Sequence, residues 1–150
     1  MIGILVMEHT TFNQRKIRNI TSDNFGKYGT VIEFTPGYRE DFEIRVRQDE
    51  GGWRLAVFRV PNRCAQLMEN HPNTKESFEP LQGTILLIVA ENNLPAEFEV
   101  FLLDKPICLH EGVWHQVLAL SAEAQVKIVE NIEVSTEFYY FERDIEPIIT

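Results

Sequence analysis

The sequence is poor in cysteine, in basic residues and in long apolar runs. Its two cysteines, Cys64 and Cys108, form neither a disulfide framework nor a zinc-type spacing, so we expect both to be reduced and buried in a cytoplasmic protein. Lys and Arg number 14 against 23 Asp and Glu, a formal net charge of -9. That excess of acid argues against nucleic acid or an anionic membrane as partner. The apolar run that follows Met1 is too short for a signal peptide or a membrane span.

Several motifs of common enzymes are also missing. The chain contains no G-x-S-x-G, no H-E-x-x-H and no glycine-rich phosphate loop, and neither cysteine sits in a nucleophile motif. These absences argue against a serine or cysteine nucleophile and a P-loop nucleotide site. Histidine, Asp and Glu side chains remain as candidates for acid–base catalysis or metal binding.

The apolar pattern is nearly all strand. Residues 42–47, "FEIRVR", alternate cleanly between apolar and polar, whereas residues 84–90, "TILLIVA", are continuously apolar and are expected to be covered on both faces. Further strands are expected over residues 30–35, 53–60, 98–103, 113–120, 126–132 and 138–141, separated by turn signals. The pattern predicts an all-β jelly roll, with a short N-terminal helix over residues 21–29.

Two polar segments interrupt this pattern. "ENHPNTKESFEPLQG" spans residues 69–83, and "HEGVWH" spans residues 110–115. The first resembles the first motif of the cupin superfamily, with His71, Glu76 and Gly83 near the expected positions and Asn73 in place of a second histidine. The second resembles the second cupin motif through Gly112 and His115, with His110 where a proline is usual. The resemblance implies one cupin-type jelly-roll domain over residues 1–150, with residues 1–19 as an extension that can form an edge strand.

The same segments resemble the ureidoglycolate lyase family more closely. That family has a His-Pro pair before a Phe-x-Pro-x-x-Gly turn, and a His-x-x-x-Trp-His element some 30 residues later. The matching positions here are His71, Pro72, Phe78, Pro80, Gly83, His110, Trp114 and His115. The stretch "FGKYGTVIE" is similar to the family's opening. The chain departs from the family pattern at Gln82, Leu109 and Glu111, and each change lowers positive charge or alters polarity near the motifs.

This resemblance implies cleavage of ureidoglycolate to glyoxylate and urea, a step of allantoin and purine degradation. Histidine titrates near neutral pH, so His71, His110 and His115 are the expected acid and base groups. Arg59 is expected to bind the carboxylate of the substrate with its planar fork. The other expected substrate contacts are Glu76, Ser77, Phe78 and Trp114.

Alternatives remain open at this stage. The reaction needs no cofactor if imidazoles alone move the protons, or His71, Glu76 and His115 hold a divalent metal as a Lewis acid. His115 can instead be a hydrogen-bonded core residue, and His110 a surface residue. The chain can also be a cupin that binds a small carboxylic acid or sugar without turnover, or a protein whose strands mainly build a dimer. A homodimer is expected in each case, because exposed sheet edges need covering.

Overall fold

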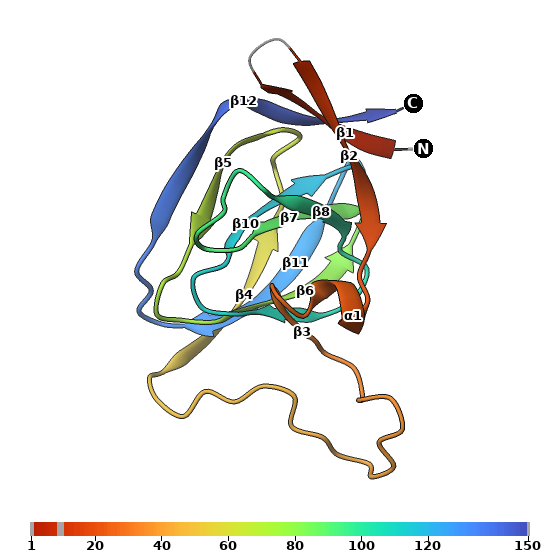
Figure 1. Cartoon of the computed structure of the whole chain (residues 1–150). Helices are drawn as coiled ribbons and strands as arrows, with labels where there is room; N and C mark the ends of the chain where they lie inside the picture. Colours follow the sequence, from red (N-terminus) through yellow and green to blue (C-terminus); the bar gives the residue numbers. More distant parts are fainter. Residues whose placement is uncertain (1, 9–10, 150) are drawn as a thin grey trace.

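The computed structural model describes residues 2–8 and 11–149, and it is built almost entirely of strands (Figure 1). Seven strands follow one another in a closed order, in which β1 pairs with both β12 and β2. In that order they are β1 (Ile2–Glu8), β12 (Glu137–Ile149), β5 (Ala65–Asn70), β10 (Trp114–Ala119), β7 (Ile85–Ala90), β8 (Glu99–Leu102) and β2 (Thr11–Asn19). The pairing of β2 with β8 is parallel, and the other described pairs of this barrel are antiparallel.

A second sheet of five antiparallel strands packs against this barrel. Its order is β3 (Gly29–Val31), β9 (Ile107–Leu109), β6 (Glu76–Gln82), β11 (Gln125–Asn131) and β4 (Trp53–Arg59). The strand β4 stands at the end of that order and pairs with β11 on one side. The all-β prediction is therefore confirmed. Within the described ranges, no helix is long and apolar enough to cross a membrane.

The strand β7 connects two apolar cores. Ile85, Leu87 and Val89 belong to the core between the two sheets, together with side chains from both. Leu86 and Ile88 belong to the other core, which lies inside the closed set of seven strands. All six residues of β7 are buried, as the continuous apolar run predicts.

The helix is shorter than the sequence predicts. The helix α1 covers only Ser22–Phe25, with Thr21 as its N-cap in a reciprocal capping box with Asn24. It ends at Gly26, and Gly29, expected to close it, instead begins β3 and pairs with Leu109. Residues 26–28 form a turn, and at Gly29 sheet pairing outweighs local helix propensity.

The strands expected over residues 30–35 and 42–47 are mostly wrong. The strand β3 ends at Val31, and residues 32–52 contain neither helix nor strand. We call residues 32–52 the arm; it runs out from the barrel before returning at β4 (Figure 1). A strand needs a neighbour for its backbone hydrogen bonds, and residues 42–47 have none within the described chain.

Gly83 provides a test of the turn between β6 and β7. Its φ is +78°, and an added Cβ would lie 2.0 Å from the Glu123 carbonyl oxygen. We expect Gly83→Ala to lower the free energy of unfolding by about 3 kcal/mol, because left-handed strain and a backbone clash add. Urea denaturation measures this. Gly37→Ala is the matched control, since Gly37 has a φ of +84° and open space around it; the two variants should not have equal effects.

Candidate active site

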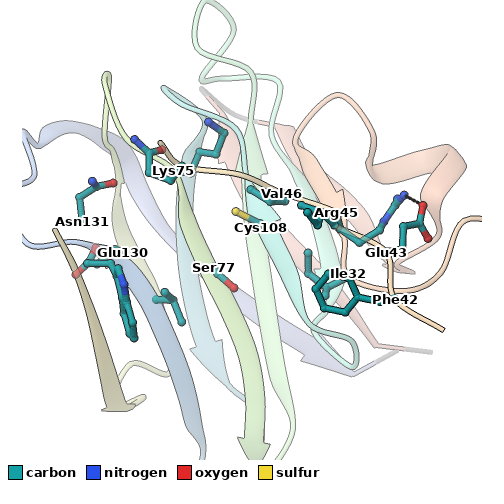
Figure 2. Close-up of a pocket in the computed structure, with 14 residues that line it drawn as sticks. Ile32, Phe42, Glu43, Arg45, Val46, Lys75, Ser77, Cys108, Glu130 and Asn131 are labelled. Carbon is teal, nitrogen blue, oxygen red and sulfur yellow. Dashed lines mark hydrogen bonds and ion pairs between the residues drawn. The ribbon is translucent and has the colours of Figure 1, made fainter. Parts of the chain in front are cut away.

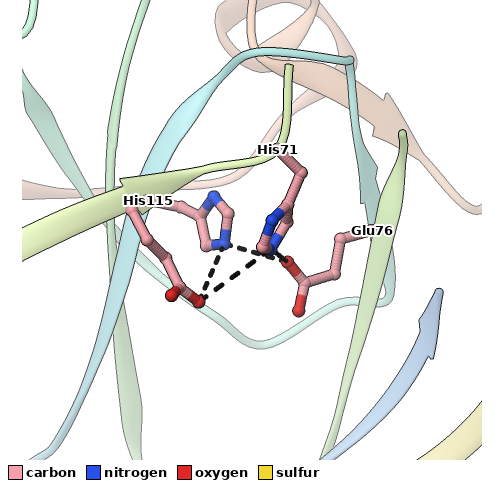
Figure 3. A group of neighbouring side chains, drawn as sticks. His71, Glu76 and His115 are labelled. Atoms are coloured by element: carbon pink, nitrogen blue, oxygen red, sulfur yellow. Dashed lines mark ion pairs between the residues drawn. The ribbon is translucent and has the colours of Figure 1, made fainter. Parts of the chain in front are cut away.

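A cavity of about 300 Å³ lies between the two sheets and contains one histidine from each polar segment, His71 and His115. One wall carries His71 and His115, and Glu76 faces them from the other wall (Figure 3). Phe78 also lines the cavity. The remaining wall is partly apolar and partly charged. It consists of Arg54, Phe58, Glu69, Gln116, Val117, Ile128, Glu130, Val134 and Thr136.

Strand register brings the four polar residues of this cluster together. On the barrel side, His115 of β10 stands opposite Glu69 of β5, and His71 follows two residues after Glu69. Residues two apart share a face of an extended chain, so Glu69 and His71 both point inward. Glu76 begins β6 on the other sheet. The metal-binding atoms of these four residues all lie within 4.8 Å of one another.

Backbone carbonyls orient both imidazole rings. His71 Nδ1 lies 3.1 Å from the Ser135 carbonyl oxygen, and His115 Nδ1 lies 3.0 Å from the Val113 carbonyl oxygen. A carbonyl oxygen only accepts, so each Nδ1 carries the hydrogen and donates it. The neutral form of each ring then turns the lone pair of Nε2 toward the cluster, as in metal-binding histidines.

Glu76 lies at the centre of the cluster. Its Oε2 is 2.9 Å from Nε2 of His71 and 2.9 Å from Nε2 of His115 (Figure 3). Burial opposes the charge of Glu76, but attraction to the two imidazoles outweighs it and lowers the pKa of the carboxyl to about 2. Burial likewise opposes the charge of His71, yet Glu76 raises its pKa to about 9. Burial also opposes the charge of His115, but attraction to Glu76 outweighs it and raises the pKa of that ring. The site therefore attracts positive charge.

The cluster fits a divalent metal. Glu76 Oε2 and His115 Nε2 are buried and have no hydrogen-bond partner among the described residues, despite their 2.9 Å separation. Two imidazoles and a carboxylate are a common ligand set for divalent transition metals. Glu69 lies farther away, with Oε1 at 3.7 Å from His115 Nε2 and 4.0 Å from His71 Nε2, and its side chain is 39% exposed. It is therefore either a fourth ligand or a group that faces the substrate.

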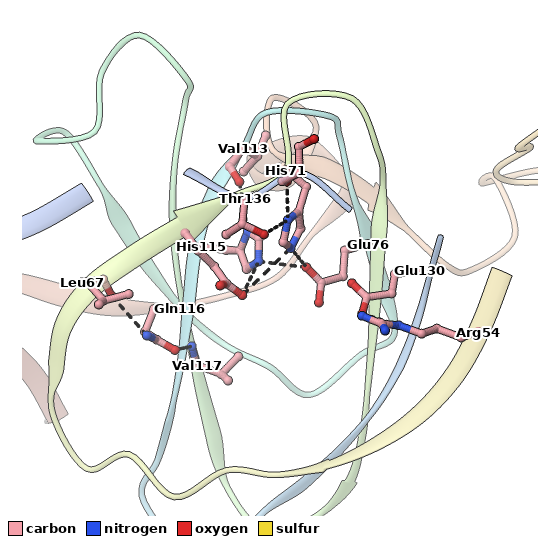
Figure 4. Close-up of polar contacts among 12 residues, drawn as sticks. Arg54, Leu67, His71, Glu76, Val113, His115, Gln116, Val117, Glu130 and Thr136 are labelled. Carbon is pink, nitrogen blue, oxygen red and sulfur yellow. Dashed lines mark hydrogen bonds and ion pairs between the residues drawn. The ribbon is translucent and has the colours of Figure 1, made fainter. Parts of the chain in front are cut away.

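An arginine reaches the cavity along the inner face of the second sheet. Arg54 of β4 pairs in register with Glu130 of β11, which pairs in register with Glu76 of β6. Arg54 Nε and Nη2 donate to Glu130 Oε1 at 3.0 and 2.6 Å (Figure 4). Neighbouring strands are about 4.8 Å apart, so the backbone of Arg54 lies roughly 10 Å from that of Glu76. A small carboxylic acid can span the distance between the Arg54 guanidinium and the histidine cluster.

The structure brings together His71, Glu76, Phe78 and His115, but not the other expected site residues. Arg59 lines a separate pocket that also contains Arg63 and Glu123, because five positions along β4 place it on the face opposite Arg54. Ser77 lies on the face of β6 opposite Glu76, beside Cys108.

Two residues of the "HEGVWH" segment also lie outside the cavity. Trp114 points away from His115, packs against Tyr139 and donates from Nε1 to the Asn92 carbonyl oxygen. This is the alternation expected of a strand without a bulge. His110 is exposed, and its Nε2 lies 2.9 Å from the Gly26 carbonyl oxygen. We therefore place Arg59, Ser77, Trp114 and His110 outside the candidate site.

Sequence reasoning missed Glu69 and Arg54. Asn73, expected at the position of a second cupin histidine, is exposed and outside the cluster. Glu69 stands two residues before His71, inside the strand, and therefore shares its inward face. Asn73 stands two residues after His71, in the turn, where strand alternation no longer applies. The sequence gives a weaker indication for Arg54, namely that it lies on a predicted strand whose successive side chains point to opposite faces.

Comparison with known proteins identifies a family for this chain. A sequence model described as ureidoglycolate lyase matches residues 38–146. The ureidoglycolate lyase of Agrobacterium fabrum is 31% identical, over 69% of this chain and 75% of that protein. Ureidoglycolate lyase 1 of Rhizobium meliloti is 29% identical, over 87% of this chain and 92% of that protein.

A solved structure shares the fold at low sequence identity. The RmlC structure from Streptococcus suis in complex with dTDP-D-xylose has a TM-score of 0.50 and 14% identity, and the match covers 89% of this chain and 63% of that one. The likeness supports the cupin-type jelly-roll barrel and not a shared substrate. On the match over residues 38–146, the chain belongs to the ureidoglycolate lyase family.

Proposed function

We propose that this protein is a metal-dependent ureidoglycolate lyase that splits (S)-ureidoglycolate into glyoxylate and urea. One observation carries the proposal: two inward-facing imidazoles and a buried carboxylate converge at 2.9 Å beside an arginine, in a chain of this family. We also propose that the chain works as one cupin-like domain, as a homodimer, in the cytoplasm. Both cysteines are free, which supports a reducing compartment.

In this proposal His71, Glu76 and His115 hold a divalent ion such as Mn²⁺ or Zn²⁺. When bound, the ion acts as a Lewis acid that polarises a substrate oxygen. Carbonyl hydrogen bonds to each Nδ1 keep both rings oriented with Nε2 toward the ion. Glu76 supplies negative charge at the same point. The reaction thus takes place where the protein already favours positive charge.

Arg54 binds the carboxylate of the substrate. Its guanidinium has five N–H donors, and the Glu130 carboxylate engages Nε and Nη2, so capacity remains for a second acid. Glu130 fixes the arginine side chain in the cavity. Phe58, Phe78 and Val117 contribute apolar surface to the wall and reduce the space for water.

The proton balance assigns a role to Glu69. The carbinol hydroxyl loses a proton, and the departing urea nitrogen gains one. In this proposal the two histidines bind the ion and do not transfer protons. Glu69 borders the cavity and is partly exposed. Glu69 accepts the hydroxyl proton and returns it to the urea nitrogen, which makes it the general acid and base.

Glyoxylate release tests the function. Protein supplied with Mn²⁺ or Zn²⁺ should release glyoxylate from (S)-ureidoglycolate well above the spontaneous rate. Glu69→Gln should keep the metal and lower kcat by about 100-fold or more, the usual contribution of a general base. Metal content by mass spectrometry separates the two effects. Thermal stabilisation by ureidoglycolate without product would instead support a binding protein of the same fold.

Metal affinity should depend on pH in a direction set by His71. Below its pKa of about 9 the metal-free ring carries a proton that the ion must displace. The association constant should therefore rise by at least about tenfold per pH unit between pH 7 and this pKa, with proton release, because the pKa of the second ligand His115 is raised as well. Calorimetry in buffers of different ionisation enthalpy measures both. His71→Ala should abolish binding and His110→Ala should not; equal loss in both would contradict the ligand assignment.

The two arginines of β4 form a matched pair for the carboxylate site. Arg54→Gln should raise KM by roughly 10- to 100-fold, because a charge-assisted hydrogen bond is worth about 1.5–3 kcal/mol. Arg59→Gln should leave KM within about twofold, since exposed surface charges contribute little. Steady-state kinetics distinguish the two residues, and a larger effect at Arg59 would contradict the placement of the substrate.

A further inference from the structure

Residues 42–47 of the arm have the sequence pattern of a β-strand but not the backbone hydrogen bonds of one. In residues 42–47, Phe42, Ile44 and Val46 alternate with Glu43 and Arg45. No backbone–backbone hydrogen bond joins these six residues to the rest of the described chain. Phe42 is 77% exposed and Ile44 is 61% exposed. A segment with this pattern is stable when it lies along a sheet edge and covers an apolar face.

The strand β4 offers such an edge and such a face. It is the last strand of the five-stranded sheet, and among residues 2–8 and 11–149 no strand pairs with its other side. Trp53, Leu55 and Val57 share its outer face and are 68%, 59% and 68% exposed. Large exposed apolar side chains in a row mark an interaction surface more often than an ordinary exterior.

A groove separates the arm from its own sheet. It has a volume of about 490 Å³ and lies over the outer face, between Phe42, Ile44 and Val46 on the arm and Trp53, Ser77 and Val129 on the sheet (Figure 2). The arm therefore does not cover the apolar strand face within one chain.

We propose that a second copy of this chain covers this surface, with the arm of each copy added as a strand along the free edge of β4 in the other. The chain carries both halves of the contact, an unpaired strand-like segment and an unpaired edge, which is what a two-fold interface requires. This inference rests on the homodimer proposed above and names its surface.

Side-chain alternation selects the register of this contact. An antiparallel arrangement with Ile44 opposite Leu55 also sets Phe42 opposite Val57 and Val46 opposite Trp53, so all the apolar side chains share the outer face. A slip of one residue would turn them to the other face.

The selected register places the contact beside the cavity and fixes which charges face one another. On the inner face it sets Arg45 opposite Arg54, and each of these arginines already pairs with an acid of its own chain, Glu43 and Glu130 respectively. It also sets Glu40 opposite Arg59, a complementary pair at the rim. Because Arg54 and Phe58 of β4 line the histidine cavity, the added strand borders that cavity.

Mass in solution tests the dimer. Light scattering should give twice 17.4 kDa for the intact chain. Leu55→Glu with Val57→Glu should raise the dimer dissociation constant by about 30-fold or more, the loss expected at the centre of an interface. Phe138→Glu with Tyr140→Glu is the control, because both residues are similarly exposed on β12, and the dimer should persist. Far-UV circular dichroism confirms folding of each variant.

Cross-linking tests the surface itself. A chain with Ile44→Cys, mixed with a chain with Leu55→Cys and oxidised, should form a disulfide between the chains, both in a Cys64→Ser background. Ile44→Cys mixed with Phe138→Cys should not. A monomeric intact chain would overturn the homodimer and this surface together. A dimer that survives Leu55→Glu with Val57→Glu and gives no Ile44–Leu55 cross-link would overturn the surface alone, and glyoxylate release would be unaffected by that result.

Discussion

The buried carboxylate of Glu76 is the constraint on which the site depends. An ionised acid inside a protein costs several kcal/mol unless positive charge accompanies it. Here carbonyl groups hold each imidazole so that Nε2 faces Glu76 at 2.9 Å, and only a proton or a metal ion between these atoms satisfies all three. Because His115 and Glu76 come from different sheets, the packing of the sheets and the chemistry of the cluster depend on each other.

The sequence predicts the class of fold and the core of the cluster. The apolar run of β7 indicates a strand covered on both faces, and the structure confirms it. The two polar segments identify His71, Glu76, Phe78 and His115, which meet in one cavity. These predictions succeed because each depends on residue types at short spacing, which turns and strand alternation translate directly into position.

The remaining site residues depend on which face of a strand points inward. Arg54 and Arg59 lie on the same strand, and so do Glu76 and Ser77, so composition cannot distinguish them. Which face of β4 points into the cavity follows from its register with β11, a contact between residues about 70 positions apart. Residues 42–47 show a related limit, because their pattern specifies a strand but not the neighbour that would complete it.

The ladder between β2 and β8 has a consequence for the order of folding. Residues 17–19 pair with residues 100–102, and β1 pairs with the far end of β12. During synthesis the β1–β2 hairpin leaves the ribosome with both outer edges open, and the first of these closes only after more than half of the chain has been made. Contacts this distant in sequence slow folding. Among the described strands, β1 and β2 are therefore synthesised well before the neighbours with which they complete the barrel, β12 and β8.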